Sequence, residues 1–273
     1  MSRIGEKFAR LKAAGLKALV PYLTAGDPDL ETTGQLILEM ERAGADIIEL
    51  GVPFSDPIAD GPVIQRAADR ALRRGTTLAG CLGLIRELRR ASDIPLVLFS
   101  YLNPLLQFGM ERLASALSDA GVDGVLVTDL IVEEADPFIA PFRERGIDTI
   151  FLVAPTSTDE RMRRISRYCR GFVYVVSRTG VTGTGEKLAE TMRPTVERVR
   201  RFTELPIAVG FGVSTPEHVR QVWQYADAAV VGSAIVREIE RQAGNSHLVS
   251  AIGRFTRWLK AAADERSATD PVG

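Results

Sequence analysis

Four carboxylic acids stand in the stretch 46–62, DIIELGVPFSDPIADGP, and the spacing of three of them, Glu49, Asp56 and Asp60, could support acid–base chemistry. Glu49 lies inside a short apolar run of strand-forming residues, of the kind found in parallel sheets that are buried on both faces. A carboxyl group in such surroundings holds its proton more tightly than in water, so it can both donate and accept one. Asp56 and Asp60 follow in a loop rich in Gly and Pro, which rules out a continuing strand.

Both Glu49 and Asp60 also have a purely structural interpretation. Glu49 could pair with a basic side chain, because an unpaired buried carboxylate destabilises a fold by several kcal/mol. Asp60 could help to cap the helix that Gly61-Pro62 predicts, since Pro favours the first helical position. A carboxylate at the C-terminal end of a strand, with further acids on the next loop, is nevertheless typical of the catalytic end of an α/β barrel.

The chain that positions these acids alternates strand-forming runs with amphipathic helices. Eight runs are predicted to be strands, the second at the start of the stretch 46–62 and the others at 18–24, 95–101, 124–130, 149–154, 172–177, 206–211 and 228–231. Helices are predicted at 30–43, 62–74, 77–91, 111–120, 133–145, 159–169, 189–202 and 215–225, with a short one from Ser233, a long one over 247–262 and an extra one before the first strand. Such alternation indicates a parallel sheet that is covered by helices.

Eight strand–helix units in a chain of 273 residues predict an α/β fold of the (β/α)₈ type, the TIM barrel. A doubly wound open sheet is the alternative, because a small error in the strand count would also fit it. No shift in composition marks a second domain. We therefore expect a single domain over 1–263, followed by a polar, disordered tail over 264–273.

The overall composition excludes several classes of function. Basic and acidic side chains nearly balance, 34 against 35, so no net field attracts nucleic acid or an anionic membrane. No apolar run approaches the ~20 residues of a membrane span, and the charged N-terminus is unlike a signal peptide. Two distant cysteines and two isolated histidines have no metal-binding spacing, and the cysteine usage favours a reducing compartment. We expect a cytoplasmic protein without a metal site.

Glycines gather in the loops that follow the sixth, seventh and eighth predicted strands, at 180–185, at 210–212 and at Gly232 before Ser233. Backbone N–H groups of such loops, beside a helix N-terminus, can hold a phosphate group, and in barrels this site commonly follows strands seven and eight. Each glycine taken alone could equally mark a tight turn. Aromatic side chains also stand at four strand ends, Tyr22, Tyr101, Tyr174 and Phe211. These rings could line a flat pocket or only pack the barrel.

The stretch 49–65, ELGVPFSDPIADGPVIQ, closely resembles the signature of the tryptophan synthase α subunit family. Further motifs fit in order over nearly the whole chain: YLTAGDP at 22–28, YLNP at 101–104, SRTGVTG at 177–183, GFGVSTP at 210–216 and GSAIV at 232–236. The resemblance implies a TIM barrel that cleaves indole-3-glycerol phosphate to indole and glyceraldehyde 3-phosphate, a retro-aldol reaction. It also implies an α₂β₂ complex in which the tryptophan synthase β subunit carries pyridoxal phosphate, so that no cofactor is expected in this chain.

The same resemblance implies roles for individual residues. Glu49 is the implied acid–base group, Asp60 the acceptor of the indole N–H, and Tyr174 a neighbour of the reacting hydroxyl. Substrate contacts are implied for Tyr22, Phe99, Tyr101, Arg178, Thr182, Gly183, Phe211, Gly212, Gly232 and Ser233. Contacts with the β subunit are implied for Pro53, Asp56, Pro57, Asn103, Pro104 and Phe108.

The sequence departs from the family pattern at three points. Ile131 stands where Pro is usual in a loop that faces the β subunit, the loop after the sixth strand has an extra Gly, and Tyr22 replaces a common Phe. Two other functions stay open: a free-standing indole-glycerol-phosphate lyase, and a non-catalytic sensor of a phosphorylated ligand that regulates a partner. The intact Glu49 and Asp60 argue against the sensor, and turnover of the isolated chain would separate the two lyase forms.

Overall fold

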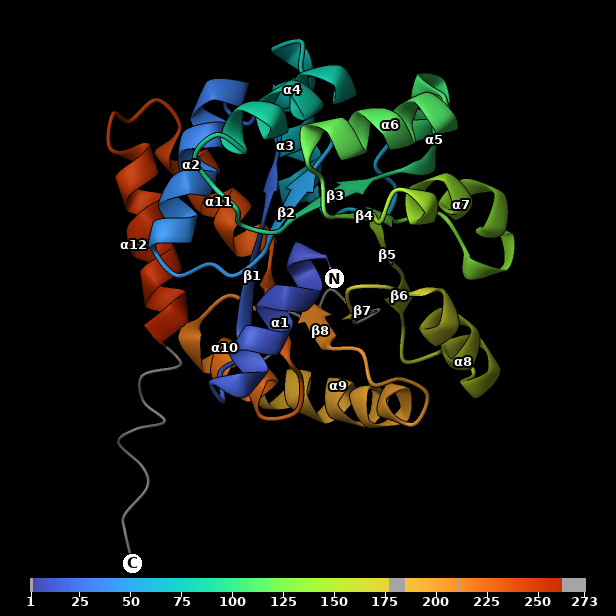
Figure 1. Cartoon of the computed structure of the whole chain (residues 1–273). Helices are drawn as coiled ribbons and strands as arrows, with labels where there is room; N and C mark the ends of the chain where they lie inside the picture. Colours follow the sequence, from blue (N-terminus) through green and yellow to red (C-terminus); the bar gives the residue numbers. More distant parts are fainter. Residues whose placement is uncertain (1, 177–184, 211, 262–273) are drawn as a thin grey trace, which may run out of the picture.

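The structure, a computed structural model (Figure 1), describes residues 2–176, 185–210 and 212–261. The strands are β1 (Ala18–Thr24), β2 (Ile48–Gly51), β3 (Leu96–Ser100), β4 (Gly124–Val127), β5 (Asp148–Ile150), β6 (Leu152–Val153), β7 (Val173–Val176), β8 (Ile207–Gly210) and β9 (Ala228–Val231). The helices are α1 (Arg3–Ala13), α2 (Leu30–Arg42), α3 (Pro62–Arg73), α4 (Leu78–Leu88), α5 (Leu102–Phe108), α6 (Met110–Ala120), the 3₁₀ turn η1 (Val132–Glu134), α7 (Asp136–Glu144), α8 (Asp159–Tyr168), α9 (Gly185–Arg200), α10 (Pro216–Trp223), α11 (Ser233–Gln242) and α12 (Leu248–Lys260).

The strands form one parallel sheet that closes into a barrel. Their order is β5-β4-β3-β2-β1-β9-β8-β7-β6. β5 and β6, at the two ends of this order, are successive pieces of one stretch that is interrupted at Phe151. The N–H of Phe151 donates to Cys169 Sγ at 3.3 Å. The predicted TIM barrel is therefore confirmed and the open sheet is wrong, and the predicted fifth strand is two short ones.

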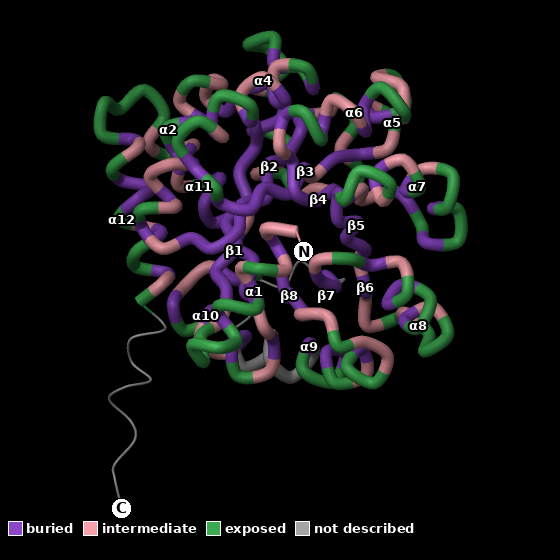
Figure 2. Tube along the Cα trace, in the orientation of Figure 1, coloured by how far each residue is buried: buried purple, intermediate pink, exposed green. Residues whose placement is uncertain are grey.

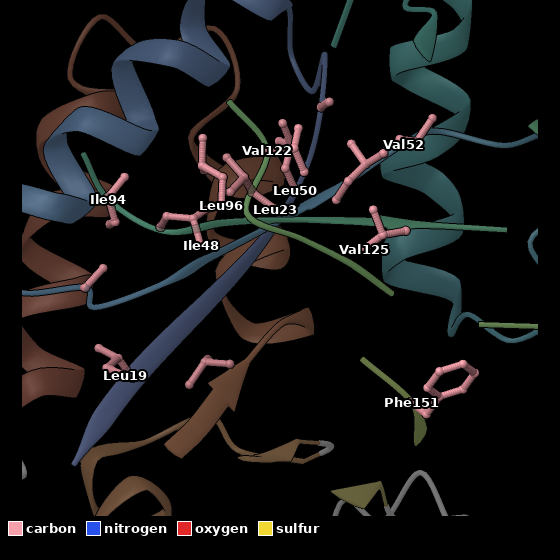
Figure 3. Packing of buried hydrophobic residues seen from close by; sticks show 14 of the residues in the cluster. Leu19, Leu23, Ile48, Leu50, Val52, Ile94, Leu96, Val122, Val125 and Phe151 are labelled. Atoms are coloured by element: carbon pink, nitrogen blue, oxygen red, sulfur yellow. The ribbon is translucent and has the colours of Figure 1, made fainter. Parts of the chain in front are cut away.

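Successive side chains of each strand face two different apolar layers, as the pleat requires. Leu19, Ile48 and Leu50 face outward and belong to the large core between the sheet and the helices, part of which Figure 3 shows. Val20 and Val97 face inward and belong to a second cluster that fills the barrel. Figure 2 shows the resulting arrangement, with buried strands at the centre and exposed outer helix surfaces.

Helix α1 closes the end of the barrel at which the strands begin (Figure 1). Its Ile4 and Phe8 are buried in the inner cluster, and the ring of Phe8 lies 5.9 Å from that of Phe172. Gly124 leaves room for this helix, because a Cβ there would lie 2.9 Å from Ile4 Cδ1. The extra N-terminal helix is thus confirmed, and the C-terminal ends of the strands are left for the site.

Three aspartates, which we call the basal aspartates, join neighbouring strands at the end that α1 closes. Each stands just before one strand and accepts the N–H of a residue on the neighbouring strand that precedes it in the chain. These bonds are Leu19 N–H to Asp46 at 2.9 Å, Leu96 N–H to Asp123 at 2.8 Å and Ile207 N–H to Asp227 at 2.9 Å. Basic side chains pair with the same carboxylates, among them Lys260 with Asp46, Arg89 with Asp123, and Lys17 and Arg200 with Asp227.

The predicted elements differ from the structure mainly around prolines. β1 and β9 begin and end where the first and eighth strands were predicted, and the short helix from Ser233 is α11. Helix α5 was not predicted; Pro104 lies in its first turn, where a missing N–H breaks no helical bond. The helix predicted over 133–145 instead begins at Asp136, with Pro137 in its first turn and η1 before it.

Candidate active site

The carboxyl group of Glu49 lies inside the barrel on β2, between two side chains that face outward. It is fully buried, and among the described residues neither of its oxygens has a hydrogen-bond partner. Burial raises its pKa from 4.5 to about 8. The side chain is therefore protonated at neutral pH. The pairing with a basic residue that the sequence left open is absent from the part of the chain that the structure describes.

Asp60 lies in the loop between β2 and α3, and its carboxylate faces the aromatic end of β3. Its Oδ2 accepts a hydrogen bond from the Tyr101 hydroxyl at 3.0 Å. Burial raises the pKa of Asp60 to about 6, against the lowering effect of this hydrogen bond. The N-cap of α3 is Gly61, and no side chain caps that helix. Asp60 is therefore not a helix cap, in contrast to the structural interpretation.

Tyr101, the residue after β3, anchors the loop of residues 52–61, which we call the acidic loop. Its hydroxyl donates to Asp60 and accepts the N–H of Ala59 at 2.9 Å. Its ring lies 5.2 Å from that of Phe54, near the start of the same loop. Tyr101 was predicted as a substrate contact, and the structure adds this second role. The sequence did not single out Ala59 or Phe54, because a residue that holds a loop through its backbone or ring has no motif.

Two glycines leave the space that two buried tyrosine hydroxyls occupy. A Cβ on Gly51 would lie 2.1 Å from the Tyr22 hydroxyl, and one on Gly210 would lie 2.1 Å from that of Tyr174. Both tyrosines face the barrel interior, and burial raises the pKa of each well above 10. The extra hydroxyl of Tyr22 lies 3.5 Å from Thr24 Oγ1, which the sequence did not identify as its partner.

A small apolar cluster lies beside Glu49. Tyr22 is the register partner of Glu49 on β1, and its ring meets that of Phe99 edge-on at 5.2 Å. Ala67 of α3 and Val236 of α11 are buried against the same rings. The predicted aromatic contacts Tyr22 and Phe99 are therefore brought together, and the two helices α3 and α11 complete the wall behind them.

The predicted phosphate residues lie at the ends of β8 and β9. Gly212 has φ +75°, a conformation that favours glycine. Gly232 is the N-cap of α11, whose first N–H groups have no acceptor within the helix, and Ser233 is its first residue. Gly232 also lies near Tyr22, because a Cβ there would be 3.6 Å from the Tyr22 Cβ. The carbonyl of Gly212 contacts His218 Nδ1 at 3.2 Å, a neighbour for which the sequence carried no signal.

The residues predicted to meet a partner surround the same end of the barrel. Asp56 is exposed and accepts a hydrogen bond from Ser55, whereas Pro53 is buried and Pro57 is half-buried. The other three, Asn103, Pro104 and Phe108, lie on helix α5, with Asn103 exposed and the others half-buried.

Three exposed apolar side chains on neighbouring segments extend this set. Ile58 in the acidic loop is 85% exposed, Leu106 on α5 is 45% exposed and Ile131 after β4 is 43% exposed. Tyr101 joins the acidic loop to the start of α5, and the N–H of Leu102 donates to Asp129 at 2.7 Å. The sequence signal for Ile58 and Leu106 was available, since each is a large apolar residue outside the predicted strands and helices.

Several predicted residues lie outside the described residues: Arg178, Thr182, Gly183 and Phe211, and the predicted tail 264–273. Within the described ranges, no group of three or more His, Cys, Asp or Glu side chains could hold a metal ion. In the same ranges, no helix is both long and apolar enough to cross a membrane.

Comparison with known proteins identifies the family to which this chain belongs. The family model of the tryptophan synthase alpha chain matches residues 8–263. The chain belongs to this family. The tryptophan synthase alpha chain of Solibacter usitatus (strain Ellin6076) is 53% identical to it over 260 residues, which cover 95% of this chain and 97% of the relative. The tryptophan synthase alpha chain is the indole-3-glycerol phosphate lyase subunit, a carbon–carbon lyase of tryptophan biosynthesis.

Solved structures of the tryptophan synthase alpha family share the fold over almost the full length. Subunit alpha from Legionella pneumophila str. Paris has a TM-score of 0.90 at 37% identity, covering 97% of this chain and 99% of that chain. A chain of the tryptophan synthase α₂β₂ complex from Pyrococcus furiosus has a TM-score of 0.84 at 41% identity, covering 89% of this chain and 98% of that one.

Proposed function

We propose that this chain cleaves indole-3-glycerol phosphate to indole and glyceraldehyde 3-phosphate, and that Glu49 moves the protons of the reaction. The observation that carries the proposal is the buried, unpartnered carboxyl group with a pKa of about 8. In its protonated form it donates to indole C3. The carboxylate that remains accepts the proton of the side-chain hydroxyl, the bond to C3 breaks and the aldehyde forms. The enzyme then ends with Glu49 protonated, as it began.

Asp60 supplies an electrostatic contribution in this proposal. With a pKa of about 6 it is mostly ionised at neutral pH, so it can accept the indole N–H and stabilise the positive charge that protonation at C3 creates. The pKa values of Glu49 and Asp60 fall on opposite sides of neutrality. Two carboxyl groups that differ in this way can take the two roles of proton donor and anion within one pocket.

The remaining residues bind the substrate. We place the indole ring against Tyr22, Phe99 and Tyr101, and the reacting hydroxyl beside Tyr174. Backbone N–H groups of Gly212, Gly232 and Ser233 would hold the phosphate, together with Gly183 and Phe211, and Arg178 and Thr182 would also contact the substrate. Support comes from the φ of Gly212 and from the free N–H groups at the start of α11.

We propose further that the chain acts in the cytoplasm as a single domain over 1–263, in an α₂β₂ complex with a tryptophan synthase β subunit that holds the pyridoxal phosphate. The partner surface would be Pro53, Asp56, Pro57, Asn103, Pro104 and Phe108. The exposed apolar side chains of Ile58, Leu106 and Ile131 support it, because they lie on the same or neighbouring segments and would lose contact with water on docking. The likeness to a chain of the Pyrococcus furiosus complex supports it as well.

The test is indole release from indole-3-glycerol phosphate, measured for the isolated chain and with rising β subunit. Glu49→Gln should bind the substrate but release indole about 10²–10⁴-fold more slowly. Glu87→Gln, on an exposed side chain, is the matched control and should behave as wild type. More than about a tenth of wild-type turnover in Glu49→Gln would remove Glu49 from the role. Fast turnover that the β subunit does not change would favour the free-standing lyase, and substrate binding without any turnover would favour the sensor.

A further inference from the structure

An ion-pair network around one buried aspartate lies where the loop after β1 meets α3 and α11. Arg70 of α3 donates from Nε and Nη2 to the two carboxylate oxygens of Asp27, at 2.9 and 2.8 Å. Its Nη1 donates to Glu240 of α11 at 2.7 Å. The Asp27 side chain is only 2% exposed, so Arg70 is the counter-charge of a buried anion.

Arg66, one turn earlier on α3, gives the natural comparison. It binds Glu240 through two hydrogen bonds of 2.8 Å each and does not contact Asp27 in the bonds that the structure records. Its side chain is 53% exposed, against 30% for Arg70. Arg66 therefore joins α3 to α11 at the surface, whereas Arg70 joins both helices to a buried carboxylate on the loop after β1.

The two helices that Arg70 connects lead directly to opposite parts of the site. Asp60 is two residues before the start of α3, and Gly232-Ser233 begins α11. Arg70 and Glu240 each lie about two turns inside their helices, roughly 12 Å along the axis. We therefore place neither side chain in contact with the substrate. Between them and the site, Ala67 and Val236 pack under the rings of Tyr22 and Phe99.

We propose that Arg70 is a positioning residue, which sets the distance between the carboxylate that receives the indole and the turn that receives the phosphate. The inference rests on the proposed function, because that function places Asp60 and Gly232 at the two ends of one substrate. A bidentate bond to a buried carboxylate fixes α3 along its axis, and the third donor fixes α11 against it. A change in this spacing affects a ligand that spans both ends more than a ligand that fills one end.

The experiment compares a spanning ligand with its two fragments. Affinities for indole-3-glycerol phosphate, for indole and for glycerol 3-phosphate are measured in the Glu49→Gln background, whose slow turnover leaves the substrate intact during the measurement, with and without Arg70→Met. We expect affinity for the spanning ligand to fall about tenfold or more, while the affinity for each fragment changes by no more than about twofold. The matched control Arg66→Met should weaken the spanning ligand by at most about fivefold, as for a surface ion pair.

Unchanged affinity for the spanning ligand, or an equal loss for the ligand and both fragments, would overturn the positioning role. Arg70→Lys keeps one charge against Asp27 but not the bidentate geometry, and it provides a folded variant if Arg70→Met does not fold. Its loss of affinity for the spanning ligand should lie between that of the protein with intact Arg70 and that of Arg70→Met. A protein with intact Arg70 that does not bind indole-3-glycerol phosphate would instead overturn the proposed function itself.

Discussion

Replacing Glu49 by Gln should make the protein more stable as well as inactive. The Glu49 carboxyl has a pKa of 4.5 when unfolded and about 8 when folded, so the folded state binds its proton more tightly. Its contribution to stability is complete below pH 4.5 and is lost as the pH rises toward 8. Each pH unit in that window is worth about 1.4 kcal/mol. At pH 7, about 2.5 units above the unfolded pKa, the loss is about 3 kcal/mol, and Gln avoids it because it carries no charge.

Urea unfolding of wild type and Glu49→Gln at about pH 5, 7 and 9 measures this difference. The advantage of the variant should be small at the lowest pH, about 3 kcal/mol at pH 7 and about 5 kcal/mol at the highest. Glu87→Gln removes an exposed carboxylate and should follow the wild type throughout. A difference between wild type and Glu49→Gln that stays constant over this range would refute the reasoning, since Glu49 would then not be a neutral acid in the folded protein.

Three further predictions concern the groups around the site and the barrel end. Tyr101→Phe removes the hydrogen bond that lowers the pKa of Asp60, so the acid limb of the kcat/KM profile should move to higher pH by about one unit. If the limb does not move, Asp60 is not the group whose ionisation sets it. Gly51→Ala places a Cβ 2.1 Å from the Tyr22 hydroxyl and should lower the free energy of unfolding by about 1–3 kcal/mol. The double variant with Tyr22→Phe should recover only part of this loss, because the ring carbons Cζ and Cε2 would still lie 2.6 and 2.8 Å from the Cβ; full recovery would contradict this geometry. Asp227→Asn should destabilise the protein by about 1–3 kcal/mol at neutral pH. Burial opposes ionisation of Asp227, but hydrogen bonds from an arginine and a strand N–H outweigh it and hold its pKa below 3.8. This stabilisation is present above pH 3.8 and is lost as the pH falls through the lower folded pKa, so unfolding curves of the two proteins should converge in acid.

The strands and the principal acid could be predicted because their signals are local. β1 and β9 are runs of apolar residues whose length and neighbours define a buried parallel strand. Glu49 was recognisable because it interrupts such a run with a charge. Asp60 was recognisable as an acid at a helix start, but its bond with Tyr101, 41 residues away, decided between a capping and a site role.

Other features depend on pairs that are remote in the sequence. The fifth strand is interrupted at Phe151, whose N–H is bound by the sulfur of Cys169. The need for Gly51 becomes visible only when the Tyr22 hydroxyl is placed against it. Asp27 and Arg70 are 43 residues apart, and an aspartate before a proline gives no sign of a buried ion pair. Each of these features depends on contact between residues that are far apart in the sequence, so no window of neighbouring residues reveals it.

The basal aspartates have a consequence for protein engineering. Each one fixes how far a strand is staggered against its neighbour, through a bond of 2.8–2.9 Å at the end that α1 closes. The stagger of a closed barrel determines its tilt and diameter, and here it is set at the end remote from Glu49. Loops above the strands can therefore be exchanged or lengthened without releasing the bonds that hold the strands in alignment. A graft that carries a new pocket should leave Asp46, Asp123 and Asp227 unchanged, because the alignment of the scaffold depends on them.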